Sequence, residues 1–203
     1  MVAVRLLRLA GVPILQQLHI EQALLRTDSQ NWLVVNDGSS VPAIVMGISG
    51  KAEELVHIDK AIEAKVNVIK RFSGGGTVPI FCPYGNFRLA CHDYVFDENK
   101  FGGNAQAITK QRWLHHTSFL WDFEDKRMAL LQHPARVPPY RKGREHLQFL
   151  LRLKDLMPLR SAFLRQLETA VARQGFELQE ASMEEVAAIL NKEHLQTTRI
   201  IDL

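Results

Sequence analysis

The sequence has little cysteine, no long apolar run and no strong excess of charge of one sign. Only Cys82 and Cys91 occur among 203 residues, without CxxC or Cys/His spacing around them. We therefore expect free thiols in a reducing compartment and no metal site. No apolar run approaches the ~20 residues that cross a bilayer, so no membrane partner is expected. The net charge of +3 comes from scattered lysines and arginines, which argues against a nucleic-acid partner.

The remaining composition is that of an ordinary globular protein. Hydrophobic residues make up 46% of the chain and charged residues 23%, which is enough for a core in one domain with a small appendage. Residues 1–11 contain two arginines but no serine. We interpret them as the start of the domain, running into a helix, and not as a transit peptide. A cytoplasmic protein is expected, with a mitochondrial or plastid location as the alternative.

Hydrophobic periodicity predicts an α+β fold. The expected strands lie at residues 31–36, 42–48, 66–70 and 93–96, with two more between 100 and 122. The expected helices lie at residues 13–26, 58–65, 142–156 and 158–173. Ser182 and Glu185 form a capping-box sequence that opens a last helix. Helix and strands come first and helices follow, an order typical of α+β proteins.

A glycine-rich segment follows the predicted strand at 66–70. It reads Arg71-Phe72-Ser73-Gly74-Gly75-Gly76-Thr77-Val78. Consecutive glycines let a backbone approach a ligand closely, and their N–H groups form a concavity for phosphate or carboxylate oxygens. Arg71 would add a forked donor beside them. The alternative is a flexible glycine turn between two strands.

A second glycine-rich segment begins with Lys100 and reads KFGGNAQ. A lysine ammonium is a compact charge that suits a phosphate or a developing oxyanion. On a strand, Asn104 and Gln106 would share one face and Ala105 would take the other. The alternative is a surface hairpin. His115 and His116 follow, and adjacent residues on a strand point to opposite faces, so the pair cannot chelate one metal from that strand.

In this order, RFSGGGTV, KFGGNAQ and HHTSFL resemble the lipoate–protein ligase family. Members of that family carry an R-x-S-G-G-G-x-V segment, a K-x-S/G-G-N/S-A segment and an H-H-x-x-x-L strand. LQQLHIEQALL is similar to the family's first helix, with Glu21 in the place of an acid, and VPAIVMGI is similar to its V-V-I-G strand. The segment YRKGREHLQFLLRLKDLMP resembles the family's helices after the catalytic core.

The resemblance implies a mixed β-sheet flanked by helices, shared with biotin ligases, over residues 1–135, and a helical C-terminal segment over 136–203. It implies activation of lipoate or octanoate with ATP, for which Mg²⁺ would be needed, and transfer of the acyl group to a lysine of a lipoyl domain. No stably bound cofactor and a monomer are expected. Lys100 would be catalytic. The substrate-binding residues implied are Arg71, Ser73, Gly74, Gly75, Gly76, Thr77, Val78, Gly103, Asn104 and Ala105.

Two departures from the family leave other functions open. The interval at 79–92 (PIFCPYGNFRLACH) is too short for the strands and helix that the family has there. We expect it to cross the gap as an irregular connection, leaving an open sheet edge and a truncated core. GISGK at 47–51 replaces the family's Gly-Arg-x-Gln-Asn. One alternative is therefore an inert or weakly binding ligase-derived protein. Another is a cysteine-dependent octanoyltransferase that uses Cys82 or Cys91.

Overall fold

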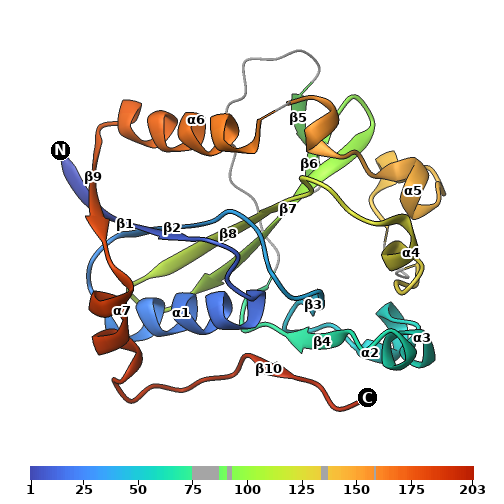
Figure 1. The fold of residues 1–203 in the computed structure, drawn as a ribbon, viewed down its shortest axis with the longest axis horizontal. Helices are drawn as coiled ribbons and strands as arrows, with labels where there is room; N and C mark the ends of the chain where they lie inside the picture. Colours follow the sequence, from blue (N-terminus) through green and yellow to red (C-terminus); the bar gives the residue numbers. More distant parts are fainter. Residues whose placement is uncertain (75–86, 91–92, 134–136, 158) are drawn as a thin grey trace. The chain divides into compact units, whose positions relative to one another are not determined.

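The computed structural model describes residues 1–74, 87–90, 93–133, 137–157 and 159–203 (Figure 1). The chain forms two compact units, each built from separated stretches of sequence. The first comprises residues 1–43 and 159–200, and the second residues 44–158 and 201–203. The boundaries of these two units differ from the division at residue 135 that was expected from the sequence. Within the described ranges, no helix is both long and apolar enough to span a bilayer.

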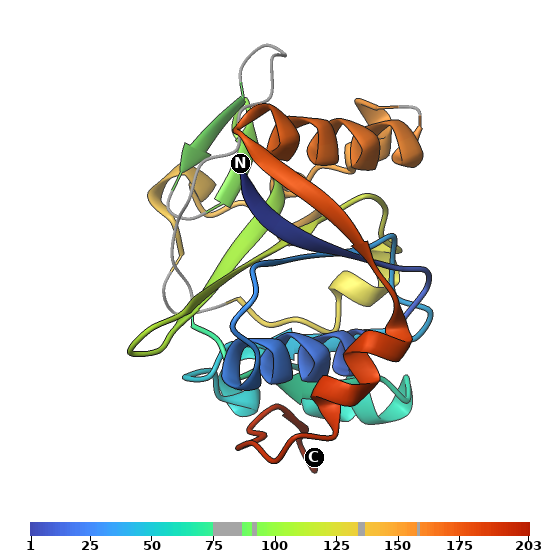
Figure 2. The same ribbon diagram turned by 90° about the vertical axis from the view of Figure 1, so that its left-hand side faces the viewer.

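The first unit is built on a three-stranded sheet with β1 (Val2–Leu9) in its centre. β2 (Trp32–Asn36) and β9 (Phe176–Ala181) both run parallel to β1, and β1 and β9 lie side by side in Figure 2. Parallel neighbours require crossover connections. The helices of this unit are α1 (Ile14–Thr27), α6 (Arg160–Arg173) and α7 (Met183–Leu190), and β10 (Arg199–Ile200) comes last.

Leucines of β1 form the core of this unit together with α1 and α7. Leu7 and Leu9 pack with Ile20 of α1 and with Val186 of α7. Leu6, on the other face of β1, is also buried, as expected for a central strand of a parallel sheet. Residues 1–11 lead into helix α1, as expected, but the strand β1 within them was not predicted. β9 was also not predicted.

The second unit begins with two strands and two short helices. β3 (Ala43–Met46) lies beside β4 (Asn67–Lys70), and α2 (Ala52–Leu55) and α3 (Ile58–Glu63) come between them in the chain. Its core contains Met46, Ala52, Val56, Ala61 and Val68, with Ile201 packed against them. The backbone N–H of Ile201 donates to the Val68 carbonyl over 2.8 Å, which ties the end of the chain to this unit.

A four-stranded antiparallel sheet follows and carries the candidate site. Its order is β5-β6-β7-β8. The bounds are β5 Phe87–Ala90, β6 Asp93–Phe96, β7 Asn99–Ile108 and β8 Trp113–Phe119. Short helices complete the unit: α4 Asp125–Met128, η1 Pro139–Arg141, α5 His146–Phe149 and η2 Leu153–Asp155. The α+β class, with small sheets flanked by helices, is confirmed.

Two predictions for the second unit were wrong. Residues 87–90 form strand β5, which pairs antiparallel with β6, so the interval at 79–92 is not wholly irregular and the outer edge of β6 is covered. Residues 79–86 and 91–92 lie outside the described residues. A helix at 142–156 does not form. Lys142 and Gly143 have φ values of 52° and 71°, in the left-handed region that an α-helix cannot continue through.

Candidate functional site

The β6–β7 hairpin positions Lys100. Val95 pairs with Lys100 and Tyr94 with Gly102, so the register shifts at this point and Phe101 is the extra residue of a bulge. Without a bulge, residues three positions apart on a strand face opposite ways. The extra residue cancels this alternation, and Lys100 therefore lies on the same face of β7 as Gly103.

Lys100 forms an ion pair with the first residue of β6. Its Nζ lies 2.7 Å from Oδ1 of Asp93, and the two side chains are 28% and 14% exposed. The other carboxylate oxygen, Oδ2, accepts a hydrogen bond of 2.7 Å from the hydroxyl of Tyr140. A Cβ built at Gly103 would lie 3.4 Å from the Lys100 Nζ. The absence of a side chain at Gly103 therefore leaves the β7 backbone directly beside the ammonium group, where a methyl group would be in van der Waals contact with it.

The first glycine-rich segment meets the second at Gly74. The N–H of Gly74 donates to the carbonyl of Gln106 over 2.7 Å, and the N–H of Gln106 donates back to the carbonyl of Gly74. β8 occupies the other edge of β7 here, and β6 begins at Asp93, opposite Gly103. The segment thus continues the edge of β7 beyond the point where β6 starts. The structure brings the two segments together.

Arg71 and Ser73 lie where β4 leads into this contact. The Arg71 N–H donates to the Met46 carbonyl over 2.9 Å, and its Nε reaches the Ser73 carbonyl at 3.4 Å. The Ser73 carbonyl also accepts from the N–H of Ile48 at 3.2 Å. Ser73 is 1% exposed, and its Oγ has no hydrogen-bond partner among the residues that the structure describes. Gly75, Gly76, Thr77 and Val78 lie outside the described residues.

The face of β7 away from Lys100 carries a row of polar side chains. Oδ1 of Asn104 accepts from the Thr117 hydroxyl over 2.8 Å, and Nε2 of Gln106 lies 3.2 Å from Nδ1 of His115. Ala105 faces the other way and is 1% exposed, as the strand alternation predicted. Burial lowers the pKa of His115, with a smaller contribution from its neighbour His116. Asn104 is thus on a different face of the strand from Lys100, Gly103 and Ala105.

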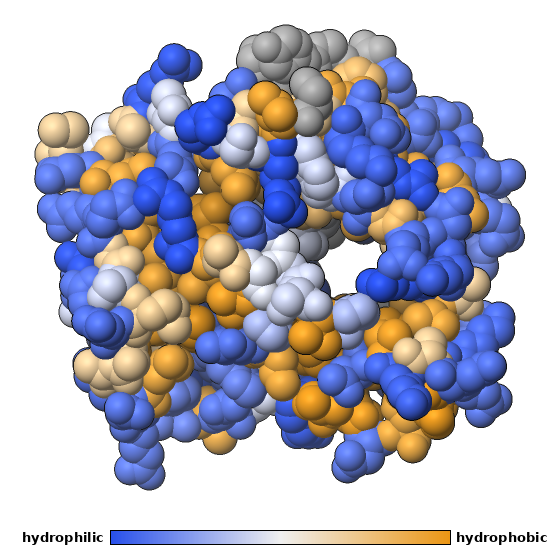
Figure 3. All heavy atoms as spheres, in the orientation of Figure 1, coloured by the Kyte–Doolittle hydropathy of each residue, from blue (hydrophilic) through white to orange (hydrophobic). Residues whose placement is uncertain are grey.

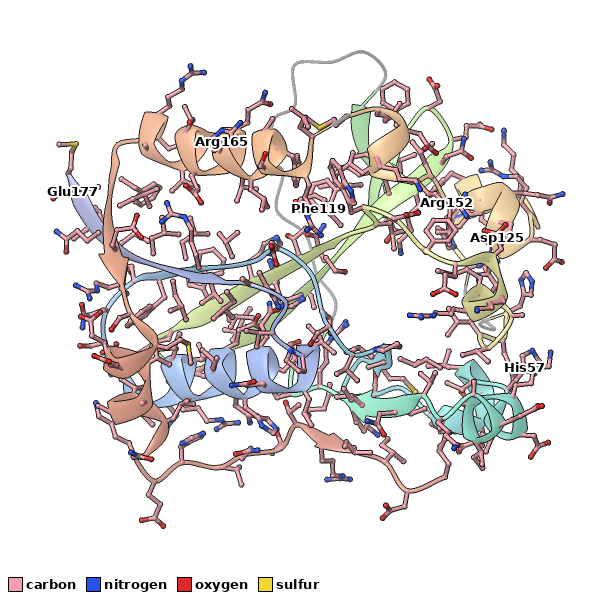
Figure 4. The ribbon with its side chains drawn as sticks, in the orientation of Figure 1. His57, Phe119, Asp125, Arg152, Arg165 and Glu177 are labelled. Atoms are coloured by element: carbon pink, nitrogen blue, oxygen red, sulfur yellow. The ribbon has the colours of Figure 1, made fainter. Side chains whose placement is uncertain are left out.

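Two aromatic rings pack at the end of this row of polar side chains. Tyr94 is almost fully buried, and its ring lies 5.5 Å from that of Phe119, labelled in Figure 4. Gly102 lies between them on β7, and a Cβ there would come within 3.1 Å of both rings. The pKa of the Tyr94 phenol is raised, because the effect of burial is larger than the opposite effect of its hydrogen bonds with Thr117 and Asn104.

Asp93 and Tyr140 were not identified as site residues from the sequence. Asp93 is an acid at a predicted strand start, and Tyr140 lies in the segment that was assigned to the helical tail. Only the antiparallel pairing of Asp93 with Gly103 reveals that this acid meets Lys100. Among the described residues, no group of three His, Cys, Asp or Glu side chains could hold a metal ion. Cys82 and Cys91 lie outside the described part of the chain.

Comparisons with solved structures agree with the sequence motifs. A crystal structure of lipoate–protein ligase A bound with ATP matches with a TM-score of 0.67 at 16% identity, covering 94% of this chain and 93% of that one. A bi-partite lipoate protein ligase from Thermoplasma acidophilum, studied with its E2 lipoyl domain, matches with a TM-score of 0.68 at 16% identity, covering 94% and 91%. This chain has the fold of lipoate–protein ligases.

The resemblance to the lipoate–protein ligase family is also supported at the level of sequence and is confirmed. A curated relative, the inactive lipoate–protein ligase 2 of Plasmodium falciparum (isolate 3D7), is 26% identical over 183 residues. That alignment covers 55% of this chain and 47% of the relative, so the chain spans about half the length of the curated relative it matches. No family model matches the sequence.

Proposed function

We propose that this lipoate ligase-like chain is an acyltransferase that modifies a protein lysine. In the first step a carboxylate oxygen of lipoate or octanoate attacks the α-phosphorus of ATP, and pyrophosphate leaves. In the second step the amine of a lysine on a lipoyl domain attacks the acyl carbonyl, AMP leaves and a proton is released. The observation that carries this proposal is the Lys100 ammonium beside Gly103, on the strand that also bonds Gly74.

In this proposal Lys100 stabilises the charge that moves between phosphate and carbonyl oxygens. The mixed anhydride would lie next to the ammonium group at Gly103, and an oxyanion there would gain a charge-assisted hydrogen bond. Asp93 holds the ammonium group in place before the substrate arrives, so little reorganisation is needed at the moment of reaction. Arg71 and backbone N–H groups of the Gly75–Val78 segment would bind the phosphate.

Mg²⁺ would enter with the nucleotide. The described residues offer no cluster of three ligating side chains, and Mg²⁺ commonly binds through substrate phosphates, water and one or two carboxylates. The proposed substrates are ATP and lipoate or octanoate, and the proposed acceptor is a lipoyl domain. We also propose that the protein is a monomer and that it is located in the cytoplasm or in an organelle.

A second candidate is a ligase-derived chain without catalytic activity. Two observations favour it: the curated relative is named an inactive ligase, and Lys100 is already neutralised by Asp93. The cysteine-dependent transferase is a third candidate, and its two cysteines lie outside the described residues.

Mass spectrometry after incubation with ATP, lipoate and a lipoyl domain separates the three candidates. Acyl-AMP and a lipoylated domain support the ligase, a thioester supports the cysteine-dependent transferase, and neither product supports the inert chain. For an active ligase, Lys100→Ala should lower the rate at least ~10²-fold, the scale for loss of one oxyanion donor. Lys110→Ala is the control, because Lys110 is exposed on the β7–β8 turn. Activity of Lys100→Ala within a few-fold of the parent would exclude Lys100 from the mechanism.

A further inference from the structure

A segment outside the glycine-rich motifs contacts the hairpin that carries Lys100. It comprises residues 139–151, from η1 through α5, and the sequence placed it in a tail beyond the catalytic domain. The structure places it in the same compact unit as β6 and β7. In the orientation of Figure 3, the surface over α4 and α5 is largely hydrophilic.

The 139–151 segment holds the β6–β7 hairpin at its turn. Arg144 donates from Nη1 to Oδ1 of Asn99 over 2.9 Å and from Nη2 to the carbonyl of Glu98 over 2.6 Å. Lys142 forms an exposed ion pair of 2.6 Å with the carboxylate of Glu98. Farther along, the N–H of Leu151 donates to the carbonyl of Lys100 over 2.8 Å. The backbone of Lys100 is thus fixed from this segment.

Beyond Leu151 the segment is anchored a second time. The guanidinium of Arg152 lies 4.2 Å from the ring centroid of Phe123 and is paired with Asp125, the two labelled side chains that meet in Figure 4. The polypeptide that follows residues 139–151 is therefore tied to the rest of the unit.

Tyr140 connects this segment to the charged pair. Its ring packs against Val95 and Phe149 in a small core and is 8% exposed. Val95 faces Lys100 in the register of the hairpin. The ring therefore lies on the Lys100 side of the sheet, and its hydroxyl reaches Oδ2 of Asp93 at 2.7 Å. Oδ1 of the same carboxylate holds the Lys100 Nζ.

With a partner on each oxygen, the Asp93 carboxylate cannot rotate freely. A lysine side chain is flexible, and its ammonium stays at one point only if its partner stays there. The hydrogen bond from Tyr140 is charge-assisted and short, and such bonds are stronger than neutral ones. Packing depends on the ring of Tyr140, whereas only its hydroxyl reaches the site.

We propose that Tyr140 is a positioning residue: its hydroxyl fixes Asp93, and Asp93 fixes the Lys100 ammonium beside Gly103. The catalytic consequence rests on the proposed acyl transfer, whereas the positioning does not. Tyr140→Phe is the decisive variant, because it removes the hydroxyl and keeps the ring. Lys142→Ala is the matched control, because it removes another contact of the same segment with the same hairpin, at an exposed position.

The first measurement is the labelling of lysines by limiting acetic anhydride, read by peptide mass spectrometry in the full chain. In Tyr140→Phe, Lys100 should be labelled on the order of fivefold to tenfold faster relative to Lys110, the scale for the net loss of one hydrogen bond. In Lys142→Ala the ratio should be that of the parent. An unchanged ratio in Tyr140→Phe overturns the proposal, and so does a uniform increase for all lysines, which would indicate general loosening.

A double-mutant cycle locates the effect at Asp93. Asp93→Asn removes the carboxylate that links the other two side chains, so Tyr140→Phe should add nothing to the labelling of Lys100 in that background. Equal effects of Tyr140→Phe in both backgrounds would mean that Tyr140 acts by another route, and would overturn the proposal.

The second measurement is the rate of acyl transfer to a lipoyl domain. Tyr140→Phe should lower kcat by about tenfold, because the ammonium is no longer preorganised, and leave the KM for ATP within about twofold. A parent that makes neither acyl-AMP nor lipoylated domain refutes the proposed function, and the labelling arms still decide the positioning. An active parent whose kcat is unaffected by Tyr140→Phe overturns the role of Tyr140 in the chemistry.

Discussion

Gly102 and Gly103 are neighbours on β7, and alanine at each should have a different consequence. They face opposite sides of the strand. A Cβ at Gly102 would come within 3.1 Å of the Ser118 carbonyl oxygen and of the rings of Phe119 and Tyr94. A Cβ at Gly103 would lie at ordinary contact distances, 3.4 Å from the Lys100 Nζ being the shortest. The first position is crowded, and the second has room.

The magnitudes follow from these contacts. Overpacking typically lowers the free energy of unfolding by about 1–3 kcal/mol. We expect the upper half of that range for Gly102→Ala, because one of the crowded neighbours is a backbone atom. Alanine recovers roughly 0.5–1 kcal/mol relative to glycine within a strand. Gly102→Ala should therefore destabilise the protein by about 2 kcal/mol and lower the Tm by about 4–8 °C in a chain of this length. Gly103→Ala should raise the Tm slightly, by about 2 °C.

Activity should show the reverse order. The methyl group of Gly103→Ala occupies the space beside the Lys100 ammonium, so acyl transfer should fall at least about tenfold in a stable protein. Gly102→Ala should keep most of its activity at a temperature well below its Tm. Differential scanning calorimetry and a lipoylation assay on the two variants provide the test. A destabilised Gly103→Ala, or a Gly102→Ala as stable as the parent, would refute the placement of the two residues on opposite faces.

Two further variants test local features. Ser182→Ala removes the oxygen that accepts from the N–H of Glu185 at the start of α7, so the free energy of unfolding should fall by about 1 kcal/mol in denaturant titration; an unchanged midpoint would contradict the capping role. Burial lowers the pKa of His146 below 6.5, and the positive charge of Arg141 lowers it further. The unfolded chain therefore binds more protons, and stability present above pH 6.5 should fall as the pH drops below it. The loss between about pH 7.5 and about pH 5.5 should be smaller in His146→Gln, and an equal loss would exclude this residue as a source.

Elements with strong local signals were predictable from the sequence. α1, α6, β4 and β6 to β8 lie where periodicity placed them, and α7 begins at its capping box. β1 was missed because a central strand buried on both faces has no alternation, and its two arginines resemble a polar helix face. In the structure Arg5 pairs with Glu185, and Arg8 with Glu168 and Glu180. These partners lie far along the sequence and could not be inferred from β1 itself.

Of the candidate site, the sequence indicated Lys100 and the two glycine-rich segments but not their supporting contacts. The bulge at Phe101 depends on pairing with β6, and the hydrogen bond from Tyr140 to Asp93 depends on how residues 139–151 fold over the hairpin. Both are tertiary effects without a local pattern. The helix predicted at 142–156 from leucine spacing also does not form, and Leu147 and Leu156 of that pattern are exposed.

The pairing of β1 with β9 has a consequence for the order in which the protein is made. Val2 pairs with Phe176, so the centre of the first unit stays incomplete on that side until most of the chain has been synthesised. The long loop between them raises the entropic cost of closure and slows this step. The second unit, almost continuous from residue 44 to 158, can form earlier on the ribosome. Until β9 arrives, one edge of β1 has unpaired backbone N–H and C=O groups, which is the point at which a nascent chain would need a chaperone.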